Sequence, residues 1–157
     1  MTLPPPVSSS PDDSSVPAEL RTRIQDDPWT RALGVQFLAL GRGFCRLGLT
    51  VQPHMVNFQG YPHGGVIFSL ADIAFGAACN SHGEPAVALN MTISFLTAVP
   101  AGSRLVAEAR EIRQGRRAGF YQVNVTSEVG ARVAQVHCVG LRLAALGAPL
   151  LGVPAEE

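Results

Sequence analysis

The chain has 157 residues, with 12 basic and 12 acidic side chains and a formal net charge of zero. Such a balance argues against a nucleic-acid partner or an anionic membrane surface. Hydrophobic residues make up 46% of the chain and charged residues only 15%, so we expect one domain with a packed core. No signal peptide or membrane span is recognised, and three scattered cysteines favour a reducing cytoplasm over a disulfide framework or zinc site.

The N-terminal part divides into a tail and a short helical region. Residues 1–16 are rich in Pro, Ser and Asp, a composition typical of a disordered tail. Pro17 precedes a segment that predicts a short helix over 18–25. A further helical turn is expected over 29–33, before Gly34.

Strand-like alternation begins at residue 35. Two strands are expected, over 35–40 and 44–51, followed by a loop over 52–62 that contains two Pro and one Gly. A long apolar helix follows over about 64–81. Further strands are predicted over 86–97, 104–113, 120–128 and 133–143, and residues 146–157 are expected to be a loose tail. The folded domain is therefore placed at residues 17–145.

The order of these elements, strands on either side of one long helix, predicts an α+β fold with an antiparallel sheet around that helix. The helix is apolar on nearly every side, which is typical of a buried helix. Because the short N-terminal segment cannot cover its free side, we expect a second subunit to do so.

One carboxylate, Asp72, lies within this apolar helix. Burial of an acid is costly unless the acid has a partner or a function. It is interpreted either as a paired structural group or as a general base or nucleophile.

The helix begins with Gly64 and Gly65, directly after His63. A helix N-terminus has unpaired N–H groups and a positive dipole end, so the Gly64 N–H is a candidate donor to an oxyanion. His63 is interpreted as a residue that supports the turn. Asn57, in the preceding loop, is either a turn residue or a group that orients water or substrate.

The sequence contains no motif for nucleophilic-serine hydrolysis or for metal binding. There is no GxSxG elbow for serine hydrolysis. The four histidines, His54, His63, His82 and His137, have no spacing typical of metal ligands. We therefore expect neither a metal nor another cofactor.

At Asn57-x-x-Gly60-x-x-His63-Gly64-Gly65, followed by Leu70-Ala71-Asp72, the chain resembles the signature of the hotdog-fold acyl-CoA thioesterases. The phenylacetate-pathway branch, the PaaI-like enzymes, is the nearest match. Ile93-Ser94-Phe95-Leu96 with Pro100-Ala101-Gly102, and Gly115-Arg116-Arg117, resemble later parts of the family pattern. The likeness covers residues 35–143.

This resemblance implies a sheet wrapped around the long helix, a homodimer, often two dimers in a tetramer, and hydrolysis of an acyl-CoA to a free acid and CoA. By the same likeness, Asp72 activates water or attacks the carbonyl, the Gly64 N–H polarises the thioester oxygen, Asn57 positions water or substrate, and His63 supports the loop. In some relatives a hydroxyl on the strand after the helix assists the water. The position here that best matches it is Ala88, with Thr92 and Ser94 nearby, so this helper is unassigned.

Substrate and CoA are expected to contact a further set of residues: Gly65, Phe68, Phe75, Asn90, Thr92, Arg116 and Arg117. The aromatic side chains are candidates to line an acyl tunnel for an aromatic or medium-chain group. The guanidinium groups match the shape of phosphate.

Gly64 and Asp72 are eight residues apart, which is about 12 Å along a helix. A base must lie close to its reacting partner, so we expect the active site to combine Asp72 of one chain with Gly64 of the other. Two alternatives remain open at this point: a hotdog dehydratase or hydratase acting on acyl thioesters, and a non-catalytic acyl-CoA sensor.

Overall fold

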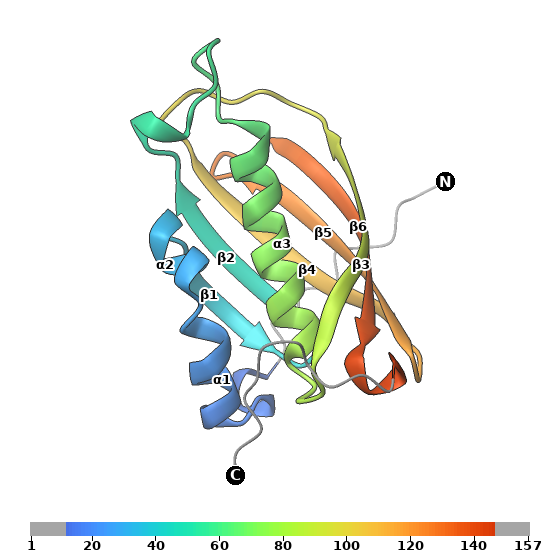
Figure 1. Cartoon of the computed structure of the whole chain (residues 1–157). Coiled ribbons are helices and arrows are strands. Elements are labelled where there is room, and N and C mark those ends of the chain that lie inside the picture. Colours follow the sequence, from blue (N-terminus) through green and yellow to red (C-terminus); the bar gives the residue numbers. More distant parts are fainter. Residues whose placement is uncertain (1–11, 147–157) are drawn as a thin grey trace, which may run out of the picture.

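The structure, a computed structural model, describes residues 12–146. A six-stranded sheet curves around one long helix, α3, and two short helices lie beside them (Figure 1). The elements in chain order are η1 (Asp13–Ser15), α1 (Ala18–Gln25), α2 (Pro28–Leu33), β1 (Gln36–Gly41), β2 (Phe44–Thr50), η2 (Pro53–Met55), α3 (Gly64–Asn80), β3 (Ala86–Phe95), β4 (Arg104–Gln114), β5 (Ala118–Ser127), β6 (Arg132–Arg142) and η3 (Leu143–Leu146).

The sheet has the strand order β1-β2-β4-β5-β6-β3, and every pair is antiparallel. The alternation of apolar side chains located these strands to within a few residues, and the predicted α+β class is confirmed. Strand β3 follows α3 in the chain but pairs with β6 at one edge of the sheet. Helix α3 therefore connects β2, next to one edge of the sheet, with β3 at the opposite edge.

Small side chains let α3 lie close to the sheet. Ala71, Ala74 and Ala78 are fully buried, and Leu70 is buried beside them. These positions recur at helical spacing and form the inner face of α3. The outer face carries Asp72, which is exposed. The expectation of an acid enclosed by an apolar helix is thus wrong for the single chain, because one side of α3 is open.

The C-terminal end of α3 is fixed to two other elements by the buried Ser81 and the partly buried Asn80. The Ser81 hydroxyl donates to the Ala78 carbonyl at 2.6 Å and accepts from the Gly43 N–H at 2.8 Å, in the turn between β1 and β2. Asn80 binds the Ala86 backbone through both its amide nitrogen and its oxygen. These contacts fix the position of the helix relative to both edge strands.

Strand β3 leaves much apolar surface uncovered. Val87, Leu89 and Phe95 are 46%, 61% and 55% exposed, respectively. A register shift between Ala88 and Asn90 places Leu89 in a bulge, so the simple alternation predicted along this strand is interrupted.

Residues 12–16 differ from the prediction of a disordered tail. Asp13 accepts hydrogen bonds from the Leu40 N–H and the Arg21 guanidinium, at 3.2 and 3.0 Å. Ser15 accepts from the Arg42 N–H at 3.0 Å, and Val16 is only 3% exposed. A polar composition suggested a tail, but two side chains suffice to attach this segment to the β1–β2 hairpin. The remainder of the predicted tail, residues 1–11, lies outside the described residues, as does most of the predicted C-terminal tail.

Within residues 12–146, no helix is long and apolar enough to cross a membrane. In the same range, no group of three or more His, Cys, Asp or Glu side chains is arranged to hold a metal ion. The three cysteines are buried and unpaired.

Replacing Val16 with Ala should lower the free energy of unfolding by about 1–3 kcal/mol, because a buried methyl pair is lost from the core. The same exchange at Val129, which is 86% exposed, is the matched control and should have little effect. Urea unfolding of both variants measures the difference. Equal effects at the two positions would show that Val16 is not docked.

Candidate active site

The first turn of α3 leaves one backbone donor free. His63 is the N-cap, and its Nδ1 accepts from the Gly65 N–H at 2.9 Å. The His63 carbonyl accepts from the N–H groups of Val66 and Ile67 at 2.9 and 3.2 Å. Among the described residues, the Gly64 N–H has no acceptor. An unpaired N–H at the positive end of a helix is suited to bind a negatively charged oxygen.

Both glycines in this turn lie close to a neighbouring ring. A Cβ on Gly64 would lie 3.2 Å from Cζ of Phe95, and a Cβ on Gly65 would lie 3.1 Å from Nδ1 of His63. A side chain at either position would therefore press on a neighbouring ring. The capping geometry depends on the absence of a side chain at Gly65.

Asn57 orders the loop before α3. Its Oδ1 accepts from the N–H groups of Gln59 and Tyr61 at 2.9 and 3.1 Å, which is the turn chemistry expected of a loop Asn. Gly60, with a φ of 83°, completes the turn. The oxygen of the amide is thus occupied, and no bond of its NH₂ group is seen among the described residues.

The helix N-terminus opens into a cavity of about 320 Å³, which we call the loop pocket. It lies between the loop, α3 and the segment after β3. Its lining residues are Asn57, Gln59, Tyr61, Pro62, Gly64, Ile67, Phe95, Leu96, Thr97, Ala98, Val99 and Val133. The pocket therefore brings together two of the predicted catalytic residues, Asn57 and Gly64.

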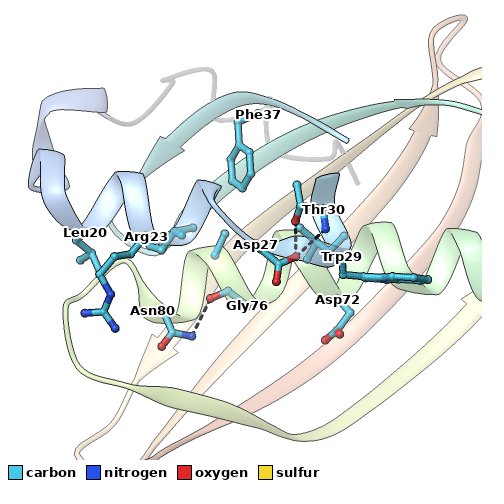
Figure 2. Close-up of a pocket in the computed structure, with 12 residues that line it drawn as sticks. Leu20, Arg23, Asp27, Trp29, Thr30, Phe37, Asp72, Gly76 and Asn80 are labelled. Atoms are coloured by element: carbon cyan, nitrogen blue, oxygen red, sulfur yellow. Dashed lines mark hydrogen bonds between the residues drawn. The ribbon is translucent and has the colours of Figure 1, made fainter. Parts of the chain in front are cut away.

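Asp72 lies in a second cavity, of about 480 Å³, between α3 and the N-terminal helices (Figure 2). We call it the α1–α3 groove. It is lined by Leu20, Arg23, Ile24, Asp27, Trp29, Thr30, Phe37, Asp72, Ile73, Gly76, Ala77 and Asn80. In Figure 2, Trp29 and Asp72 lie at one end of the groove, and Leu20, Arg23 and Asn80 lie at the other.

The carboxyl of Asp72 is accessible but only partly hydrated. Partial burial raises its pKa above the ordinary value, and the negative charge of Asp27 raises it further. The Asp27 carboxylate is fixed by its role as the α2 N-cap, accepting from the Thr30 N–H and hydroxyl, both at 2.7 Å. A carboxylate with a raised pKa is a better proton acceptor, which suits a general base.

Within one chain, the base and the oxyanion donor do not meet. Gly64 lines the loop pocket and Asp72 lines the α1–α3 groove. The eight residues between them correspond to about 12 Å along the helix.

The other predicted contact residues are scattered. Phe68 is half-buried on α3, whereas Phe75 lies in the core with its ring 5.4 Å from that of Tyr121. Phe75 lines neither cavity. The register of β3 with β6 places Asn90 opposite Val139 and Thr92 opposite His137, which is exposed, whereas Met91 lies opposite the buried Cys138. Directly paired residues share a face, so the two polar side chains point away from α3.

Arg116 and Arg117 lie at the other end of the molecule. With Arg142 and Glu84 they line a cavity of about 390 Å³ near the C-terminal end of α3. The Arg117 carbonyl accepts from the Arg142 N–H at 3.0 Å. From Gly64 to Asn80, α3 is about 24 Å long, so this cavity and the loop pocket lie near opposite ends of the helix in one chain.

The groove also contains residues that no sequence motif marked as candidate site residues, notably Asp27, Trp29 and Gly76. Their positions depend on how α1 and α2 pack beside α3. The one local signal was the Asp27-Pro28 step, which predicts a helix start but not its neighbours.

Residues 59–134 match the thioesterase superfamily. Acyl-coenzyme A thioesterase PaaI of Escherichia coli is 39% identical over 110 residues, which cover 70% of this chain and 79% of that protein. A putative esterase of Archaeoglobus fulgidus is 34% identical over 110 residues, or 70% of this chain and 71% of that protein.

Solved structures agree with this assignment. The E. coli PaaI protein from the phenylacetic acid degradation operon matches with a TM-score of 0.76 and 36% identity, covering 78% of this chain and 89% of that one. The smu.793 protein of Streptococcus mutans, bound to acetyl CoA, matches with a TM-score of 0.67 and 27% identity, covering 69% and 87%. The chain belongs to the thioesterase superfamily and has the hotdog fold, as the motifs predicted.

Replacing Asp72 with Asn should raise the melting temperature near pH 7. The raised pKa of Asp72 means that folding disfavours the carboxylate, and the neutral amide removes this penalty. Below about pH 3 the acid is protonated in both the folded and unfolded states, so the gain should disappear there.

Calorimetry of both proteins across this pH range measures the effect. Glu128→Gln, at an exposed carboxylate, is the control for a change of surface charge. A variant that melts below the wild type at pH 7 would contradict the sign argued here.

Proposed function

We propose that this chain hydrolyses acyl-CoA thioesters to a free acid and CoA. The observation that carries the proposal is the Gly64 N–H at the start of α3, which has no acceptor within residues 12–146, with a carboxylate of raised pKa two turns along the same helix. The names of the relatives support it, since acyl-CoA thioesterases are among the proteins that the chain resembles.

In the proposed reaction, Asp72 removes a proton from a water molecule that attacks the thioester carbon. The carbonyl electrons move to oxygen, and the resulting oxyanion accepts a hydrogen bond from the Gly64 N–H. The oxyanion then collapses, the C–S bond breaks, and CoA leaves as a thiolate that takes up the proton. We assign Asp72 as a general base acting through water; direct attack by its carboxylate is the alternative.

Two further residues support this chemistry. Asn57 lines the same pocket as Gly64, and its NH₂ group, which donates no hydrogen bond within the described residues, is available to hold water or the substrate carbonyl. His63 maintains the turn through its cap on Gly65. We treat it as a positioning residue rather than a proton donor.

The proposed active site combines two chains. Antiparallel α3 helices across a two-fold axis would place each Asp72 near Gly64 of the partner subunit. The open side of α3 and the exposed apolar side chains of β3 provide surface that such a homodimer would cover. We expect two dimers to form a tetramer.

The CoA phosphates are assigned to arginine side chains. Arg116 and Arg117 gather with Arg142 in one cavity, in which Glu84 neutralises part of the charge through its ion pair with Arg142. CoA is proposed as the ligand because one relative of known structure is bound to acetyl CoA. The distance of this cavity from the loop pocket in one chain means that a CoA reaching both must run along the subunit interface.

The acyl group is proposed to be aromatic, of the phenylacetyl type, or of medium chain length. Three buried, unpaired thiols support a reducing compartment such as the cytoplasm.

Thiol release from a panel of acyl-CoAs tests the proposal directly. Asp72→Asn should lower kcat by at least about 100-fold, the low end for loss of a general base. The absorbance of enoyl products, followed on the same substrates, separates hydrolysis from hydratase chemistry. Binding of acyl-CoA without any turnover by the wild type would favour a sensor instead.

A mixing experiment tests the two-chain site. Asp72→Asn and Asn57→Asp proteins are unfolded and refolded together in equal amounts. Aspartate keeps the Oδ1 acceptor that holds the loop but loses the NH₂ donor and adds a repelling charge. About half of the dimers are then mixed, and each contains one intact site, so about a quarter of the wild-type activity should return.

Each protein refolded alone is the control and should be nearly inactive. If verified mixed dimers recover no activity, Asp72 and Asn57 act within one chain and the placement of Asp72 opposite the partner's Gly64 is wrong.

A further inference from the structure

The α1–α3 groove has Asp72 at one end and is lined beyond it by both apolar and polar side chains. Asp72 stands at one end beside Trp29, whose large side chain is 55% exposed. Ile24 and Phe37 lie on the wall opposite α3. From Asp72 to Asn80 the groove follows α3 for about 12 Å. Arg23 and Asp27 also line the groove, but its apolar side chains and its size suit an elongated, mainly apolar group that starts at the Asp72 carboxylate.

Gly76 forms the floor of the groove one helical turn beyond Asp72. Glycine is unfavourable in the middle of a helix, so its presence calls for a reason. Packing does not supply one, because a Cβ on Gly76 would meet no atom within 4 Å. Gly140 is a contrast, since a Cβ there would lie 2.4 Å from the Cys79 sulfur. The space above Gly76 is therefore open rather than filled by a neighbour.

The far end of the groove is already ordered. The Asn80 amide donates to the carbonyls of Gly76 and Ala86, at 2.9 and 3.1 Å, and accepts from the Ala86 N–H at 2.9 Å. Asn80 thus has no need of a ligand, and it holds the end of α3 against the start of β3. Across the groove, Thr30 and Asp27 fix the start of α2. Both walls have defined positions before any substrate arrives.

We propose that the α1–α3 groove holds the acyl group of the substrate and that Gly76 determines the size of acyl group that it takes. The inference rests on the proposed function, because it starts from Asp72 at the thioester carbon. The carbonyl lies at the Asp72 end, and an apolar chain or ring extends over Gly76 between α3 and the N-terminal helices. The subunit that supplies the base therefore also supplies the acyl pocket.

Gly76→Leu tests this assignment. The new side chain has four carbon atoms and would occupy the open space, displacing a similar length of acyl chain. Each displaced methylene costs about fourfold, so the ratio of kcat/KM for decanoyl-CoA to kcat/KM for butyryl-CoA should fall by about 250-fold. Gly76→Ala, which adds one methyl group, is the matched control and should lower the ratio by no more than about fourfold.

Binding of S-decyl-CoA and S-butyl-CoA, thioethers that cannot be hydrolysed, provides a second readout. Calorimetry should show that Gly76→Leu weakens the decyl compound selectively. Melting curves confirm that each variant is folded, and Gly76→Val replaces Gly76→Leu if the larger residue is not tolerated.

The outcomes separate the two proposals. If the wild type releases thiol from both esters but Gly76→Leu leaves the ratio unchanged, the groove is not the acyl pocket, although the proposed function stands. If the wild type releases no thiol, the proposed function fails, and the thioether affinities alone decide whether the groove binds acyl chains. Equal loss of affinity for both thioethers would overturn the inference.

Discussion

The packing of one face of α3 against the curved sheet is the constraint on which the site depends. Alanines at positions 71, 74 and 78 are fully buried, and they let the helix approach the strands closely. Because that face is committed to the core, helical geometry turns Asp72 and Gly76 to the opposite side. The open face is therefore a direct consequence of where the small side chains lie, and the two cavities that contain Gly64 and Asp72 both border α3.

A second consequence concerns the helix start. Caps normally satisfy as many N–H groups as they can. Here the ring and carbonyl of His63 together take the donors of Gly65, Val66 and Ile67 but leave that of Gly64. The Asn57 oxygen is used in a similar way within the loop, which leaves only its NH₂ group. In both cases structural hydrogen bonds hold a residue that lines the loop pocket and leave one of its donors without a partner among the described residues.

Sequence patterns predicted the elements well because alternation and helical periodicity are local properties. The spacing of Gly64 and Asp72 also gave their separation along α3 without any knowledge of tertiary contacts. The exposure of Asp72 was not predictable from the sequence. Apolar residues such as Phe68 and Ile73 also lie toward the open side of α3, so the helix shows no clear polar face. The docking of Asp13 and Val16 was missed because their neighbours have the composition of a tail. The groove itself depends on how α1 and α2 pack, which no local pattern of these short helices specifies.

The position of the groove wall in the chain has a consequence for how this family diverges. The stretch shared with the superfamily, residues 59–134, contains Gly64 and Asp72 but neither α1 nor α2. The proposed catalytic residues Gly64 and Asp72 and the opposing wall of the groove are thus encoded in separate segments. Substitutions in the first 37 residues can reshape the groove without touching Gly64 or Asp72. Under the assignments proposed above, acyl preference and catalytic mechanism can evolve at different rates within a single small domain.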